Sequence, residues 1–151
     1  MSAYPFFACG LVILHMKRGL NDNKLTPTVL YQLITKELGF IDVCKNKNEF
    51  DATKNIWFNK SFCNPPFSRK FIFIKMGIES HRRGSEVLLY LPFDPRTWWF
   101  KLLYQENVLI MVFMKRMGCA KYPHALYHLK NYNKTEVVLV QNESEIVNFL
   151  K

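Results

Sequence analysis

The chain has 151 residues, of which 49% are hydrophobic and 22% charged, and its formal net charge is +9. This balance excludes a disordered chain and fits one domain with one core. The positive surplus favours a polyanionic partner such as a nucleic acid, but it also fits a generally basic surface, because the charges are spread along the chain. The four cysteines show no C-x-x-C spacing, which argues against a zinc site and indicates free thiols inside a cell.

The longest apolar run, residues 4–14, is too short to span a bilayer and lacks the basic segment that begins a secretory signal. It fits a buried strand, and it also fits an upstream extension of a chain whose translation starts at Met16. We therefore treat residues 1–18 as an extension or an extra strand. We expect residues 19–151 to form a single domain with a cytoplasmic location and no membrane association.

The first element with clear ends is a helix over residues 26–39. Thr26 is placed to cap this helix, Pro27 suits its first turn, and Gly39 suits its end. A short buried strand is expected over residues 40–44, followed by a polar loop. The apolar stripe of the helix consists of Leu30, Leu33, Ile34 and Leu38.

A strand-like run over residues 56–63 leads into a double proline, and a helix over residues 68–82 follows, with Ser68 as its cap. Phe71, Ile74 and Ile78 are expected on one side of this helix. The remaining predicted elements are a strand over 85–92, a helix over 95–106, strands over 107–114 and 136–142, and a helix over 143–151.

The alternation of strands and helices predicts an α/β fold with a mostly parallel sheet and helices on both faces. His124 and His128 lie four residues apart and would share a helix face. We interpret them as surface or groove residues and expect no metal site.

The double proline forms a rigid corner, because proline fixes φ and donates no backbone hydrogen bond, so Pro65 and Pro66 cannot continue a strand. Parallel sheets bind ligands outside the carboxyl ends of their strands, where Asp42 also falls. Asn64 offers a side-chain carbonyl, Pro65 a backbone carbonyl and Phe67 a ring face. Two acceptors and a ring suit the exocyclic amine of a base such as adenine, swung out of its duplex.

The segment NPPF at 64–67 resembles the [D/N]-P-P-[Y/F] motif of amino-group methyltransferases that use S-adenosylmethionine. Residues 25–52 together with 61–68 resemble the phage-type DNA N6-adenine methyltransferases, with their Thr-Pro helix, Asp-x-Cys strand and Cys-Asn-Pro-Pro segment. Residues 87–100 are similar to that family's Leu-Pro strand and its following Thr and Trp-Phe helix. The similarity spans residues 19–142.

The resemblance implies a compact Rossmann-like methyltransferase fold, S-adenosylmethionine as cofactor, and direct methyl transfer to adenine N6 in DNA. Asn64 and the Pro65 carbonyl would accept hydrogen bonds from the target amine at the corner stiffened by Pro66, and Phe67 would stack on the flipped base. A virus or phage would be the source. The residues expected at the cofactor are Thr26, Pro27, Asp42, Cys44 and Asp51, and those expected at the nucleic acid are Arg69, Lys70, Lys115 and Arg116.

Two departures from the family pattern are visible. Residues 42–48 contain no glycine turn, and the segment KRMG at 115–118 replaces a Gly-Arg turn. The span from Asp42 to Asn64 also leaves little room for the usual second and third strands. These departures keep open a non-catalytic nucleic-acid-binding module on a degenerate methyltransferase fold. Methylation of RNA adenine, cytosine N4 or a protein glutamine also stays open, because the same motif serves those reactions.

Two further features are interpreted without a catalytic role. Cys63 is expected to be a small buried residue. The segment TWWF at 97–100 is interpreted as a packing cluster in preference to a base-stacking platform. Target recognition is expected to be loose or to come from the loops at 45–60 and 115–134.

Overall fold

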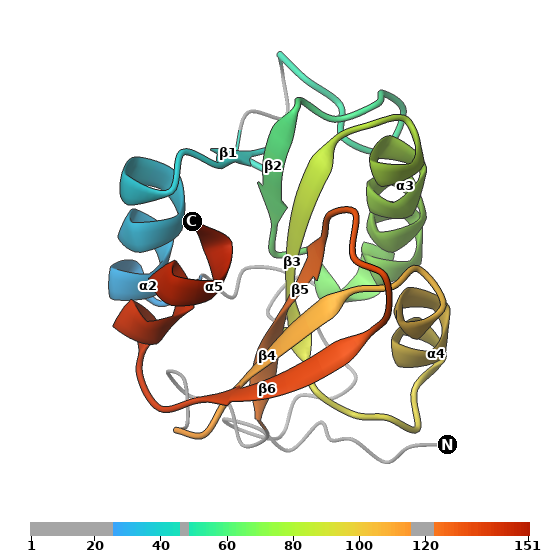
Figure 1. Ribbon diagram of the computed structural model, residues 1–151. Coiled ribbons are helices and arrows are strands. Elements are labelled where there is room, and N and C mark those ends of the chain that lie inside the picture. Colours follow the sequence, from blue (N-terminus) through green and yellow to red (C-terminus); the bar gives the residue numbers. More distant parts are fainter. Residues whose placement is uncertain (1–25, 46–48, 116–122) are drawn as a thin grey trace, which may run out of the picture.

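The computed structural model describes residues 26–45, 49–115 and 123–151. They form a six-stranded sheet between two layers of helices (Figure 1). The strand order across the sheet is β1-β2-β3-β5-β4-β6. The strands are β1 (Ile41–Asp42), β2 (Lys60–Cys63), β3 (Glu86–Pro92), β4 (Leu109–Phe113), β5 (His124–Leu129) and β6 (Glu136–Val140).

Five strands run in one direction and β5 runs in the other. β1, β2 and β3 pair in parallel, and so do β4 and β6, whereas β5 is antiparallel to both of its neighbours. The predicted α/β class is confirmed, but the sheet is mixed, so the prediction of a mostly parallel sheet holds only in part.

The strand β5 is the element that the sequence did not predict. Its two histidines suggested a shared helix face, and this prediction is wrong, because β5 lies in the middle of the sheet between β3 and β4. His128 is only 1% exposed, so its interpretation as a surface or groove residue is also wrong. His124, at the start of the strand, is half-buried.

The predicted helix at 26–39 is confirmed, with one correction at its start. It consists of α2 (Thr28–Gln32) and a π-helical turn over Leu33–Glu37, and it ends at Gly39, whose φ of +76° favours glycine. Its N-cap residue is Pro27, and no side chain caps it, so the prediction that Thr26 caps the helix is wrong.

The second predicted helix is α3 (Lys70–Arg82), which a 3₁₀ turn over Phe67–Arg69 precedes. Its N-cap residue is Arg69, so Ser68 is not the cap. Phe71 was expected on the apolar side with Ile74 and Ile78, yet it is 55% exposed. The buried face of α3 passes through Phe73, Ile74, Gly77 and Ile78 instead.

Helices cover both faces of the sheet, as predicted. α3 and α4 (Trp98–Tyr104) lie on one face, and α2 and α5 (Ile146–Leu150) lie on the other (Figure 1). Alternate strand residues enter the two cores: Leu89 packs on the side of α3, and Leu88 packs on the side of α2. A short 3₁₀ turn over Glu143–Glu145 precedes α5.

Most of the other predicted elements are confirmed with shorter bounds. The run at 40–44 contributes only the two residues of β1, since the chain turns at Val43. Thr97, not Pro95, is the N-cap of α4, and its hydroxyl accepts a hydrogen bond from the Phe100 amide at 3.4 Å. Across the described ranges, no helix has the length and apolar character needed to cross a membrane.

Candidate active site

The corner and the predicted cofactor carboxylate meet at one edge of the sheet. Asp42 is the last residue of β1, and Asn64 directly follows β2. The two strands are parallel neighbours, with Asp42 opposite Phe62, and the Val43 amide donates to the Phe62 carbonyl at 3.0 Å. Because carboxyl ends of parallel strands share an edge, these two polar side chains belong to the same part of the surface.

Asn64 links the corner to the start of α2. Its amide nitrogen Nδ2 donates to the Thr26 hydroxyl at 3.1 Å. This bond sets the orientation of the amide, so that the acceptor Oδ1 is the opposite end of the group. Thr26 was predicted near the cofactor, and the structure shows that it contacts the motif from a segment 38 residues away.

The backbone carbonyls of the two prolines differ in their hydrogen bonding. The Pro66 carbonyl accepts from the Arg69 amide at 3.0 Å and closes the following turn. Within the described ranges, the Pro65 carbonyl has no hydrogen-bond donor. Phe67 follows with a side chain that is 49% exposed, so its ring is accessible to a partner.

Asp42 has two polar neighbours. Its Oδ1 accepts the Cys44 amide hydrogen at 2.9 Å, and the Tyr31 hydroxyl lies close enough to its carboxylate to feel its charge. Burial, and then the charge of Asp42, raise the pKa of Tyr31 to about 12. Tyr31 is a further candidate for the site, and sequence reasoning missed it. Its position one helical turn after Pro27 was the available signal, because that spacing puts both residues on one side of the helix.

With this geometry in place, comparison with known families decides the assignment. Residues 14–145 match the family model of DNA N-6-adenine-methyltransferase (Dam). The chain belongs to this family. The match spans Asp42 and the corner, and it confirms the resemblance that the sequence motifs indicated. Comparisons with curated proteins and with solved structures gave no match.

Two cysteines near the corner, Cys44 and Cys63, face each other. Their sulfur atoms lie 2.9 Å apart, and Cys63 is fully buried while Cys44 is half-buried. Burial, and then the proximity of Cys44, raise the pKa of the Cys63 thiol well above its ordinary value. A protonated thiol is a poor nucleophile, so Cys63 acts as a packing residue, as predicted. A contact of Cys44 with the cofactor stays a prediction.

Asp51 organises a turn in the loop between β1 and β2. Its Oδ1 accepts from the Thr53 amide at 2.9 Å and from the Thr53 hydroxyl at 2.6 Å. These hydrogen bonds lower the pKa of Asp51. These hydrogen bonds give Asp51 a structural role within the turn. The predicted contact of Asp51 with the cofactor ribose is untested.

The predicted nucleic-acid-binding residues fall in different environments. Arg69 and Lys115 are exposed, and Arg116 lies outside the described residues. Lys70 is only 6% exposed, with its ammonium 4.3 Å from the ring centre of Phe67 and 4.0 Å from that of Trp99. Burial lowers the pKa of Lys70 to about 8. Its predicted contact with nucleic acid remains untested. In the structure, its ammonium packs against the ring of Phe67.

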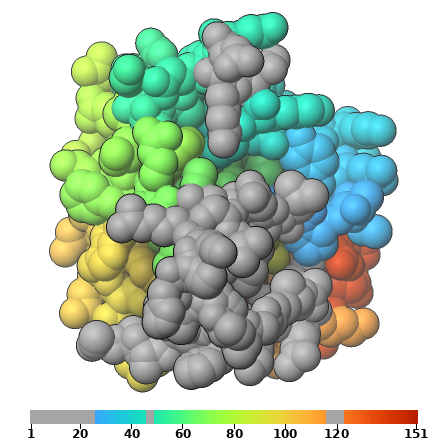
Figure 2. Space-filling view, turned by 180° about the vertical axis from the view of Figure 1, so that it is seen from behind, coloured from blue at the N-terminus to red at the C-terminus, as the bar shows by residue number. Residues whose placement is uncertain are grey.

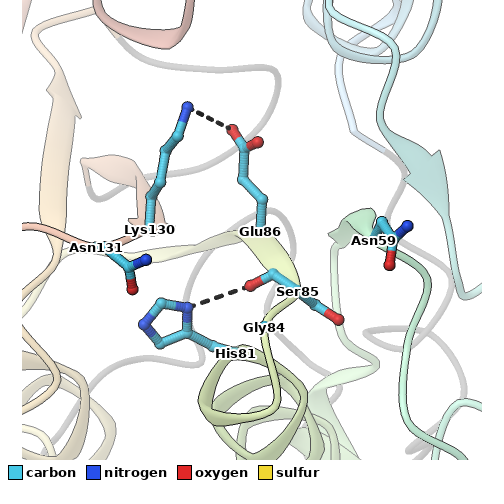
Figure 3. A pocket seen from close by; sticks show the side chains of 7 residues that line it. All are labelled: Asn59, His81, Gly84, Ser85, Glu86, Lys130 and Asn131. Atoms are coloured by element: carbon cyan, nitrogen blue, oxygen red, sulfur yellow. Dashed lines mark hydrogen bonds and ion pairs between the residues drawn. The ribbon is translucent and has the colours of Figure 1, made fainter.

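Two hollows of the Dam-family chain lie away from the corner. One, of about 250 Å³, lies at the amino end of β3 and is lined by the residues labelled in Figure 3. The other, of about 390 Å³, lies between α2 and the segment before α5. Within the described residues, no three His, Cys, Asp or Glu side chains are grouped to hold a metal ion.

Proposed function

We propose that this chain transfers the methyl group of S-adenosylmethionine to the N6 amino group of adenine in DNA. The observation that carries the proposal is the corner after β2, where half-buried Asn64 and half-exposed Phe67 follow the strand that pairs in parallel with β1, which ends at Asp42. Family membership supports the same reaction, because the matching family is one of DNA adenine methyltransferases.

The residues around Asp42 fit the polar part of the cofactor. A carboxylate fixed by the Cys44 amide is suited to an ammonium or a ribose hydroxyl, and Tyr31 and Thr26 supply further polar atoms on the same side. S-adenosylmethionine, when bound, supplies an electrophilic methyl group on a sulfonium sulfur. The chain's own task is then to hold an amine in line with that methyl group.

The acceptors of the corner act on the amine. In adenine the lone pair of the amino nitrogen is delocalised into the ring. Asn64 Oδ1 and the Pro65 carbonyl would each accept one N–H hydrogen, which favours a pyramidal nitrogen whose lone pair can form the new N–C bond. By analogy with other preorganised polar contacts, loss of one acceptor lowers the rate about 10²–10³-fold.

The exposed ring of Phe67 fits a target adenine that has left the base stack of the duplex. Adenine N6 in a duplex is paired, so a methyltransferase acts on a base that has left the stack. The ring of Phe67, which is 49% exposed, offers a stacking partner at the corner. The net charge of +9 supports a nucleic acid as the partner.

Two substitutions of Asn64 test the proposal. Asn64→Ala removes the acceptor and is expected to lower the methyl-transfer rate about 10²–10³-fold at saturating substrates. Asn64→Asp keeps an acceptor oxygen and is expected to retain much more activity. Calorimetry with S-adenosylmethionine should give similar affinities for both variants and the parent chain. Equal transfer rates in Asn64→Ala and the parent contradict the proposal, and a parent chain that binds no cofactor favours a non-catalytic DNA-binding module.

A further inference from the structure

A row of aromatic rings and cations continues outward from the corner. Lys70 lies between the rings of Phe67 and Trp99. Trp99 contacts Trp98 edge to face, with ring centres 5.7 Å apart, and Trp98 contacts Phe71 at 5.3 Å. The rings therefore form one connected series across the start of α3 and the start of α4.

The outer pair of this series is exposed. Phe71 is 55% exposed and Trp98 is 42% exposed, and the Lys75 ammonium lies 5.1 Å from the ring centre of Phe71. In Figure 2 the segment that begins α3 (green) and the segment around α4 (yellow) lie side by side on one face of the molecule. The interpretation of TWWF as a packing cluster holds for Trp99, which packs on the core, and is wrong for Trp98.

The charged side chains near Phe71 and Trp98 indicate which kind of partner binds these rings. The first turns of α3 and α4 contain no acidic residue, while Arg69, just before α3, and Lys75, in its second turn, are exposed. The first acidic residue of α3, Glu79, is paired with Arg83 at 2.8 Å. A second copy of this chain would bring another net charge of +9 to a positive face, and the two would repel. Rings in a positive field suit a DNA strand, in which each base has a stacking face and each linkage a negative charge.

We propose that the Phe71–Trp98 pair is a second stacking surface, which binds a nucleobase that flanks the target adenine. The flanking role rests on the proposed function, because a base beside a flipped adenine loses a stacking partner on one side. The exposed rings of Phe71 and Trp98 replace that partner, and Arg69 and Lys75 contact the phosphates nearby. Phe67 would then hold the target base and the outer pair its neighbour.

Binding of a fluorescein-labelled, adenine-containing DNA oligonucleotide tests this surface, in single-stranded and duplex form, by fluorescence anisotropy. Phe71→Ala and Trp98→Ala are each expected to weaken binding about 5- to 100-fold, the range for loss of one base-stacking ring. Trp98→Phe keeps a ring and should restore most of the affinity. The matched control is Phe149→Ala, since Phe149 is 40% exposed on α5, on the opposite face of the sheet, and its loss should change affinity less than twofold.

A second variant separates stacking from charge. Lys75→Gln should lower the slope of log affinity against log salt by about one, whereas Phe71→Ala should leave the slope unchanged. Thermal melting of each variant checks the fold. These substitutions replace exposed side chains, so the melting temperatures should stay close to that of the parent.

The outcomes distinguish this surface from the proposed function. Unchanged DNA affinity in Phe71→Ala and Trp98→Ala, with an active parent chain, overturns the stacking surface alone. Weakened DNA binding in these variants, with a parent chain that transfers no methyl group, supports the stacking surface and removes the proposed function. A preference of the parent for RNA over DNA, or a concentration-dependent dimer that Trp98→Ala dissolves, overturns DNA as the occupant.

Discussion

The two ends of the sheet differ in the partners that surround their buried polar side chains. At the amino end of β3, His128 is 1% exposed and fully engaged: its Nδ1 lies 2.6 Å from the Tyr132 hydroxyl and its Nε2 lies 2.8 Å from Glu86 Oε1. Burial lowers the pKa of His128, and the hydrogen bond from His128 lowers the pKa of Glu86. The hollow in Figure 3 lies beside this network, with Lys130 paired to Glu86 at 3.8 Å.

At the carboxyl end, the buried Lys70 ammonium lies against the rings of Phe67 and Trp99 instead. Within the described residues no carboxylate lies within ion-pair distance of Lys70, and burial alone accounts for its lowered pKa. Beside it, Phe67 keeps an exposed ring. The comparison teaches that the amino end is built for stability, while the carboxyl end keeps groups that cost stability, as functional sites do.

The largest expected effect concerns the stability cost of Lys70. Its pKa of about 8 in the fold is below its ordinary value of 10.5, so the unfolded chain binds more protons between these values and stability rises with pH through this window. Lys70→Met removes the titration. Chemical denaturation should show the variant more stable than the parent by up to about 3 kcal/mol at pH 7. This difference should shrink as pH rises from 8 to 10.5.

A stability difference between Lys70→Met and the parent that stays constant over that pH range would contradict the account of Lys70 as a buried cation with a lowered pKa. Lys75→Met is the control, since Lys75 is exposed on the same helix, and its denaturation at the same pH values gives the baseline for exchanging lysine for methionine there.

The next effect concerns cofactor binding at Asp42. Asp42→Asn keeps an oxygen that can accept the Cys44 amide hydrogen, but it removes the charge. Calorimetry should show the affinity for S-adenosylmethionine reduced about 10- to 100-fold, the usual range for a lost hydrogen bond to a charged group. Asp51→Asn serves as the comparison, and an equal loss in that variant would show that both carboxylates contact the cofactor.

The smallest effect is expected at the amino end and should appear in stability alone. Glu86→Ala leaves Nε2 of the buried His128 without its acceptor and should lower the free energy of unfolding by about 1–2 kcal/mol. Glu86→Gln keeps an acceptor and should cost less. The methyl-transfer rate of both variants at saturating substrates should equal that of the parent. A lower rate in fully folded Glu86→Ala would contradict the view that the amino end of the sheet contributes to stability alone.

The sequence was sufficient where one local signal dominated. The helix ending at Gly39 has an apolar stripe and a glycine that adopts positive φ, and the run at 86–92 is continuously apolar up to its proline. The corner was equally readable, because only a turn accommodates Pro65 and Pro66 after a buried strand. The family motif then connected that corner with Asp42.

The sequence was insufficient where the tertiary environment decides. β5 carries two histidines at helical spacing, and only its insertion between two buried strands makes it extended and buries His128. The different exposure of Trp98 and Trp99 depends on where α4 begins, which the Thr97 hydroxyl sets. Thr26 looked like a helix cap, but it bonds Asn64 across the fold, a partner that no local pattern reveals.

The most direct test of the central claim identifies the atom that receives the methyl group. DNA incubated with the chain and methyl-labelled S-adenosylmethionine would be digested to nucleosides and separated by chromatography, with RNA treated in parallel. The account predicts that the label is recovered as N6-methyladenine from DNA and is largely absent when Asn64→Ala replaces the parent. Label recovered on cytosine N4, on RNA or on the protein itself, or no transfer from a chain that binds the cofactor, would contradict it.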